Sequence, residues 1–255
     1  MSKFLILTGC SIDGSIDMCS HEEPRKKIEV VDVQNPLNSC SLPWKFPLSL
    51  RNAVGGFTKD GPLLCAGYSP DIYKYKSNDC FILGKTRFLN TDVKLQTERD
   101  KATAVVLPNG ELWIQGGSKG NRLKSIEVLS LQGSEYGMEL EIAVSDHCSM
   151  LINSTTIFIT GGNIGGSITS ETYFVDIHNL ISSKGPNMKE VRRSHGCAVF
   201  RHNNHKYAVV AGNLFGPLSS SMEILDLDSQ ILEWTKGKSS NSTSTIKNCK
   251  LIFEF

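Results

Sequence analysis

The sequence lacks both a long apolar segment and an excess of charge. No run reaches the roughly 18 apolar residues of a membrane-spanning helix, and the first residues, MSKFLILTGCS, hold too short an apolar run for a secretory signal peptide. The 27 lysines and arginines nearly balance the 26 aspartates and glutamates, so no global field attracts nucleic acid. We expect no membrane insertion and no nucleic-acid partner, with a cytoplasmic location if Met1 is the natural start and secretion if the N-terminus is truncated.

Motifs that hold metals or nucleotides are absent too. None of the eight cysteines forms a CxxC pair, which argues against structural zinc. His147 and His195 each lie close to a cysteine, but they occupy equivalent places of a repeat, which favours structural histidines over metal ligands. The glycine-rich segment ITGGNIGGS, from Ile159 to Ser167, lacks the Lys-Ser/Thr pair of a phosphate-binding loop and is followed by β-branched and aromatic residues. We predict no metal, nucleotide or other cofactor.

The sequence does contain an internal repeat. An apolar run ends in a small residue and a glycine five times, over residues 5–9, 63–67, 112–116, 157–161 and 208–212. A second apolar strand follows each glycine, and in four units another strand precedes the run. Each unit therefore reads as a meander of short antiparallel strands. A period near 50 residues with several strands per unit is typical of a β-propeller, in which neighbouring sheets cover one another's faces.

These units resemble kelch repeats, which also form the propeller of galactose oxidase. The last unit carries the family's pattern at Gly212, Glu223, Asp226 and Trp234. The third and fourth units keep the glycine pairs, Gly116-Gly117 and Gly161-Gly162. The resemblance covers essentially the whole chain and implies an all-β fold, with a single kelch-type propeller domain over residues 1–255.

The two ends of the chain suggest how a ring would close. The chain starts on a glycine strand, Leu5–Gly9, with no strand before it. It ends on Asn248–Phe253, which matches the strand Gly196–Phe200 and has no glycine strand after it. We expect five blades, with the C-terminal strand completing the N-terminal blade. The alternative is a fragment of a six- or seven-bladed propeller.

Three arginines are candidate partner-binding residues. Arg51, Arg99 and Arg193 lie 16 to 19 residues before the glycines of their units. We expect them to line one face and to bind an acidic segment of a partner, with solvated loop arginines as the alternative reading.

Cysteines and asparagines supply further candidates. Cys65 and Cys80 belong to neighbouring strands of one unit, which predicts a disulfide. Asn153 and Asn241 each begin an N-x-S/T triplet in a polar stretch and are candidate N-glycosylation sites. Three other cysteines are expected at one repeated position as buried, inert thiols; they are Cys148, Cys197 and Cys249.

The function that fits these features is a non-catalytic scaffold that presents inter-strand loops to a partner protein. The expected contact loops are Gly9–Lys27, Tyr68–Asp79, Gly117–Ser125, Gly162–Thr172 and Asn213–Ser221. The alternative is an enzyme on a propeller scaffold, either a copper oxidase resembling galactose oxidase or a glycan-active hydrolase.

Overall fold

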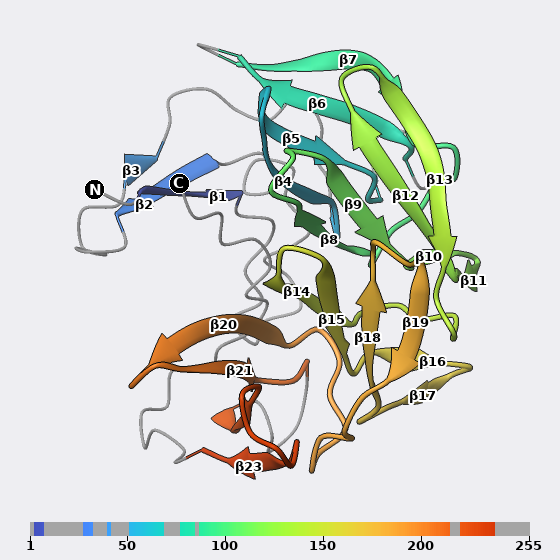
Figure 1. The fold of residues 1–255 in the computed structure, drawn as a ribbon. Coiled ribbons are helices and arrows are strands. Elements are labelled where there is room, and N and C mark those ends of the chain that lie inside the picture. The colour runs from blue at the N-terminus through green and yellow to red at the C-terminus, as the bar shows by residue number, and fades with distance from the viewer. Residues whose placement is uncertain are drawn as a thin grey trace. The chain divides into compact units, whose positions relative to one another are not determined.

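The structure is a computed structural model that describes residues 51–68, 77–84, 87–214 and 220–237, together with three strands nearer the N-terminus (Figure 1). The chain is all-β, as predicted, with no α-helix among these residues. No helix in this part of the chain is long and apolar enough to cross a membrane. The expected closing strand Asn248–Phe253, Cys249 and the candidate site Asn241 lie outside the described residues.

Four antiparallel sheets have four strands each. We number them 2 to 5 in chain order, because a smaller sheet nearer the N-terminus is sheet 1. Sheet 2 contains β4 (Val54–Thr58), β5 (Gly61–Cys65), β6 (Asp79–Leu83) and β7 (Phe88–Lys94). Sheet 3 contains β8 (Thr103–Val106), β9 (Leu112–Gln115), β12 (Ser125–Ser130) and β13 (Gly133–Glu139). Sheet 4 contains β14 (Cys148–Asn153), β15 (Thr156–Thr160), β18 (Thr172–Asp176) and β19 (Ile181–Lys184). Sheet 5 contains β20 (Gly196–His202), β21 (His205–Ala211), β22 (Met222–Asp226) and β23 (Trp234–Lys236).

Three smaller sheets complete the described strands. Sheet 1 has three strands in the order β1 (Lys3–Leu7), β2 (Ile28–Asp32) and β3 (Cys40–Ser41). Two short hairpins lie within the connections of sheets 3 and 4: β10 (Ser118–Lys119) with β11 (Asn121–Arg122), and β16 (Asn163–Ile164) with β17 (Ser167–Ile168). The chain divides into two compact units, the second made of residues 115–126 and 137–250, so that the division runs through sheet 3.

Each unit has its own apolar core. In the first unit, β4 lies near β8, and the buried cluster includes Leu63, Leu112 and Leu129. In the second unit, Phe158 stacks on Trp234 in a cluster that joins sheets 4 and 5. Strands such as β15 are apolar and buried over consecutive residues because both of their faces are covered.

A left-handed residue marks the start of all four larger sheets. One residue with φ between 48° and 56° lies just before the first strand of each sheet; these residues are Asn52, Lys101, Asp146 and Ser194. Left-handed φ is uncommon for residues other than glycine. Its recurrence at one place in four sheets shows that the sequence repeats also repeat in backbone geometry.

A second repeated feature joins sheets 2, 3 and 4 to the segments that lead into the next sheet. The backbone N–H of Gly67, Gly117 and Gly162 donates to the carbonyl oxygen of Arg99, Val144 and Arg192, respectively. A Cβ added at Gly162 would lie 2.7 Å from the carbonyl oxygen of Ser145 in the segment that leads into its own sheet, so only glycine fits this approach.

This hydrogen bond also corrects the alignment of the repeat. The sequence pattern aligns Gly67 with Gly116 and Gly161, whereas the backbone aligns it with the second glycine of each pair. Ala66 takes the first position, with a φ of 61° against 56° at Gly116. An alanine is tolerated there at a strain of about 1 kcal/mol.

Candidate binding surface at the loop ends of the sheets

The connection between the second and third strand leaves one end of each sheet, which we call the loop end. The opposite end, where the first strand turns into the second, is the turn end. The loop-end connections of sheets 3 and 4 are ordered hairpins, β10–β11 and β16–β17. The whole of the expected loop Gly9–Lys27 lies outside the described residues, as do residues 69–76 and 215–219 of two other expected loops. The two hairpins therefore define the candidate surface.

Hydrogen bonds hold these two hairpins together and closed. The Leu123 N–H donates to the Gly117 carbonyl at 2.9 Å, and the Thr169 N–H donates to the Gly162 carbonyl at 3.0 Å, so the two hairpin bases close in the same way. The Arg122 guanidinium in β11 donates to Asn163 Oδ1 in β16 at 2.8 Å. The two hairpins therefore form one connected surface.

The charge of this surface is positive on the β10–β11 side. The connection from residue 117 to 125 contains Lys119, Arg122 and Lys124 and no acidic residue, and both lysines are exposed. The tip of β16–β17, Gly165-Gly166, is exposed and carries no side chain. Such a surface is complementary in charge to acidic groups.

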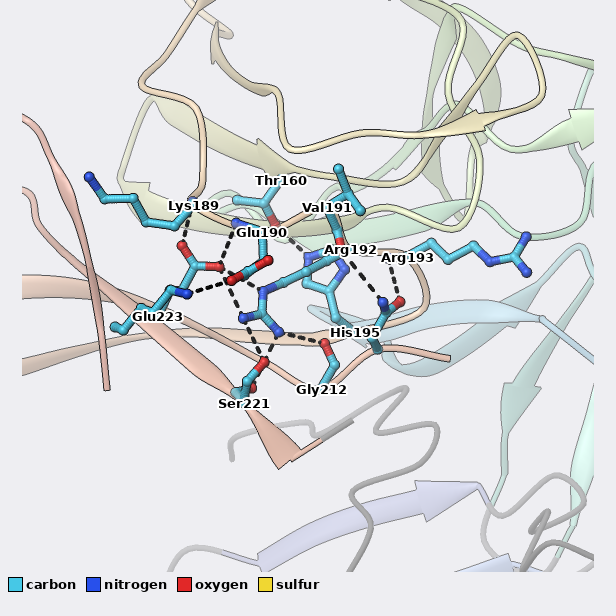
Figure 2. Close-up of polar contacts among 12 residues, drawn as sticks. Thr160, Lys189, Glu190, Val191, Arg192, Arg193, His195, Gly212, Ser221 and Glu223 are labelled. Atoms are coloured by element: carbon cyan, nitrogen blue, oxygen red, sulfur yellow. Dashed lines mark hydrogen bonds and ion pairs between the residues drawn. The ribbon is translucent and has the colours of Figure 1, made fainter. Parts of the chain in front are cut away.

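A buried ion pair lies beneath the loop end of sheet 5 (Figure 2). Glu223 in β22 accepts hydrogen bonds from Arg192 Nε at 3.0 Å and from the backbone N–H of Lys189 at 2.6 Å. Arg192 also donates to the Gly212 carbonyl and to Ser221 Oγ, each at 2.9 Å. This charged pair joins the loop-end segment of residues 189–192 to β22. Both side chains of the pair are fully buried.

Sheet 3 contains the same arrangement. Glu127 in β12 accepts from the backbone N–H of Gln96 at 2.7 Å and of Thr97 at 3.0 Å, and pairs with the Arg99 guanidinium. Burial lowers the pKa of Arg99 from its usual value, and the nearby Glu127 opposes this change. In sheet 5 the second backbone donor is the Glu190 N–H, at 3.2 Å from Glu223, and Arg192 follows it by two residues, just as Arg99 follows Thr97.

Sheet 4 lacks both members of the pair. Val144 occupies the place of the arginine, because its carbonyl, like those of Arg99 and Arg192, accepts a hydrogen bond from a glycine N–H. Tyr173 occupies the place of the glutamate: it lies two residues after Glu171, whose carbonyl accepts from the Gly161 N–H, just as Glu223 lies two residues after Ser221, whose carbonyl accepts from the Gly212 N–H. Burial raises the pKa of Tyr173, and its hydroxyl donates to Glu171 at 2.7 Å. Arginine and glutamate are thus present together or absent together in these three sheets, as expected for a pair in which either charge alone would be unstable.

The expected set of surface arginines changes accordingly. Arg99 is fully buried and so cannot contact a partner. Arg51 and Arg193 are half-buried and occupy equivalent places, each just before the left-handed residue of its sheet. The side chain of Arg193 extends away from Glu223 (Figure 2). Arg193 belongs to the second unit and Arg51 to the first, so Arg193 is the one that lies in the same unit as the two hairpins.

Sequence reasoning missed Arg192, because counting back from the glycines selects its neighbour Arg193. The sequence signal for a buried arginine is the glutamate of the third strand, although it does not separate Arg192 from Arg193. The two sheets that have glutamate at this place pair it with an earlier arginine: Glu127 of sheet 3 follows its arginine by 28 residues, and Glu223 of sheet 5 follows its arginine by 31 residues.

The cysteines confirm one expectation and correct another. Cys65 and Cys80 lie directly opposite each other in β5 and β6 and form a disulfide, as predicted. Cys148 and Cys197 also form a disulfide, between β14 and β20, so the expectation that they remain inert thiols is wrong.

The strand register explains this second disulfide. Cys148 pairs with Thr160, the residue before the glycine, whereas Gly196 and not Cys197 pairs with the corresponding Ala211. The two cysteines are therefore one position apart in the repeat. Because successive side chains of a strand point to opposite faces, each cysteine points toward the other sheet.

The histidines of the repeat are buried. His147 and His195 follow the left-handed residues of sheets 4 and 5, and the His195 Nε2 lies 2.9 Å from Thr160 Oγ1. Burial lowers the pKa of His195 to about 3, with further lowering by Arg192 and His147, so the imidazole is neutral at pH 7. The part of the chain that the structure describes contains no group of three or more histidine, cysteine, aspartate or glutamate side chains that could hold a metal ion.

No protein-family model matches the chain, and a comparison with curated protein sequences gives no match.

Proposed function

We propose that the chain is a kelch-type β-propeller of five blades that acts as a non-catalytic binding module. The repeat in backbone geometry across sheets 2 to 5 supports the architecture. Sheet 1 supports the ring closure, because its three strands correspond to the second, third and fourth strands of the other sheets. Among the strands that the structure describes, β1 pairs with β2 alone, so we propose that residues 248–253 add the first strand at its other edge.

The observation that carries the binding function is the pair of hairpins at the loop end of the second unit. The hydrogen bond from Arg122 to Asn163 and the closed hairpin bases hold this surface in shape before a partner arrives. A preformed surface loses less conformational entropy on binding than flexible loops do. The basic side chains of the connection from residue 117 to 125 favour a partner protein with an acidic segment.

Selection from a displayed peptide library tests this function. The purified full chain serves as the bait, and enriched peptides are measured against a Lys119→Glu/Lys124→Glu variant. The exposed Arg201, at the turn end of sheet 5, provides the matched control variant Arg201→Glu. We expect acidic peptides whose affinity falls about tenfold or more in the hairpin variant and is unchanged in the control.

Two results would overturn the proposal. One is the recovery of peptides whose binding does not respond to the hairpin substitutions. The other is stoichiometric copper in the purified protein, which would favour the oxidase alternative.

A further inference from the structure

The triplet Asn153-Ser154-Thr155 lies in the turn between β14 and β15, at the turn end of sheet 4. All three residues are exposed. The middle residue is not proline, so the triplet meets the sequence requirement for N-glycosylation. The turn therefore offers an accessible acceptor.

The hydrogen bonds of the folded turn are compatible with a glycan on Asn153. Asn153 Oδ1 accepts from the Thr155 N–H at 2.8 Å and from Thr155 Oγ1 at 3.2 Å. Asn153 Nδ2 makes no hydrogen bond with any residue that the structure describes. The amide oxygen is thus held by the two groups that the threonine supplies, and a sugar on the amide nitrogen would replace no hydrogen bond within the described part of the chain.

The disulfides are an independent observation that concerns the same compartment. Cys65–Cys80 and Cys148–Cys197 occur one in each unit. Disulfides form and persist in oxidising compartments such as the lumen of the endoplasmic reticulum, and they are rare in the cytosol. N-linked glycans are attached in that same lumen, so the triplet and the cysteines indicate one biosynthetic route.

We propose that Asn153 carries an N-linked glycan and that the protein matures in the secretory pathway. The glycan donor is a lipid-linked oligosaccharide diphosphate. Asn153 Nδ2 forms a bond to the anomeric carbon of the first sugar and loses one proton to a base of the transferase. The bond between that carbon and the diphosphate oxygen breaks, and the lipid diphosphate leaves with the electron pair.

The position of the glycan is compatible with binding at the loop end. In the register of β14 and β15, Asn153 pairs with Thr156 at the turn end, whereas Cys148 pairs with Thr160 at the loop end. A bulky, solvated oligosaccharide at Asn153 therefore leaves the opposite end of sheet 4, with the hairpin β16–β17, uncovered.

Expression of the full chain in eukaryotic cells, behind a cleavable signal sequence, tests the proposal. An Asn241→Gln background leaves Asn153 as the remaining N-x-S/T triplet of the sequence. We expect a mobility shift that peptide N-glycosidase removes, with mass spectrometry locating the resulting aspartate at position 153. Thr155→Ser should keep the shift, because it retains the hydroxyl, and Thr155→Ala and Asn153→Gln should abolish it.

Both the cells and the medium are examined, because the glycan is added to the nascent chain before folding is complete. A variant that folds poorly and is retained therefore still reports on Asn153. The absence of a glycosidase-sensitive shift in both fractions of the Asn241→Gln protein would overturn the proposal, as would a shift that persists in Thr155→Ala. Neither result depends on whether the loop-end hairpins bind a partner.

Discussion

Substitution of Glu223 by glutamine should strongly destabilise the protein. The change leaves the shape of the side chain almost unaltered but removes the charge that faces Arg192. Both partners are fully buried, with side-chain exposures of 0%. The guanidinium keeps its bonds to Gly212 and Ser221 but loses its counter-charge in the interior.

The expected loss can be estimated from this environment. Removing one member of a buried ion pair costs about 3–5 kcal/mol. That is a large part of the total of about 5–15 kcal/mol that stabilises a typical domain. Arg192→Met should cost a similar amount, because Glu223 is then buried without a cation. The double variant should be about 2 kcal/mol more stable than the sum of the two single changes predicts, because no unpaired charge remains.

Urea unfolding, followed by circular dichroism and tryptophan fluorescence, measures these differences. The control is Glu233→Gln, since Glu233 pairs with Lys189 at 2.5 Å but is 67% exposed. Screening by solvent makes such surface pairs weak, so we expect no measurable change in the control. The reasoning is refuted if Glu223→Gln and Glu233→Gln behave alike.

Three further predictions follow from other features. Cys148→Ser should lower the free energy of unfolding by about 4 kcal/mol, because the disulfide to Cys197 closes a loop with a sequence separation of 49. Peptide mapping that finds free thiols at Cys148 and Cys197 would contradict this prediction. Folding lowers the pKa of His195 from 6.5 to about 3, so the unfolded state binds a proton at a higher pH than the folded state does. The free energy of unfolding should therefore decrease by on the order of 5 kcal/mol as the pH falls from about 6.5 towards 3. His195→Gln should flatten this part of the stability curve, and an unchanged curve would count against burial of a neutral imidazole. Deletion of residues 248–255 should abolish cooperative unfolding if the C-terminal segment closes the ring, whereas an unaltered melting curve would exclude closure.

The sequence was informative wherever one physical requirement recurs. Doubly covered strands need consecutive apolar residues, so the strands and their order within a unit could be predicted. The alignment between units was wrong by one residue at Gly67, which is equivalent to Gly117 and Gly162. The pairing of Cys65 with Cys80 followed from the strand order, since these cysteines lie opposite each other in adjacent strands.

The errors arise where the repeat differs by one residue. Cys148 lies two residues after the left-handed Asp146, whereas Cys197 lies three residues after the left-handed Ser194. A shift of one residue in a strand reverses the face to which a side chain points. Apolar patterns tolerate such a shift, so the sequence alone could predict neither the disulfide between sheets 4 and 5 nor the choice of Arg192 over Arg193 as the buried partner of Glu223.

The disulfide between Cys148 and Cys197 also changes what happens when the backbone is cut. Exposed positions lie between these two residues, among them the glycine tip of β16–β17, and exposed loop tips are preferred by proteases. A single cleavage there would divide the polypeptide into two fragments that the disulfide still connects. Such a nicked molecule would keep its mass on a non-reducing gel and separate into two bands after reduction. The bond thus makes the second unit tolerant of a break in chain continuity across the whole of sheet 4.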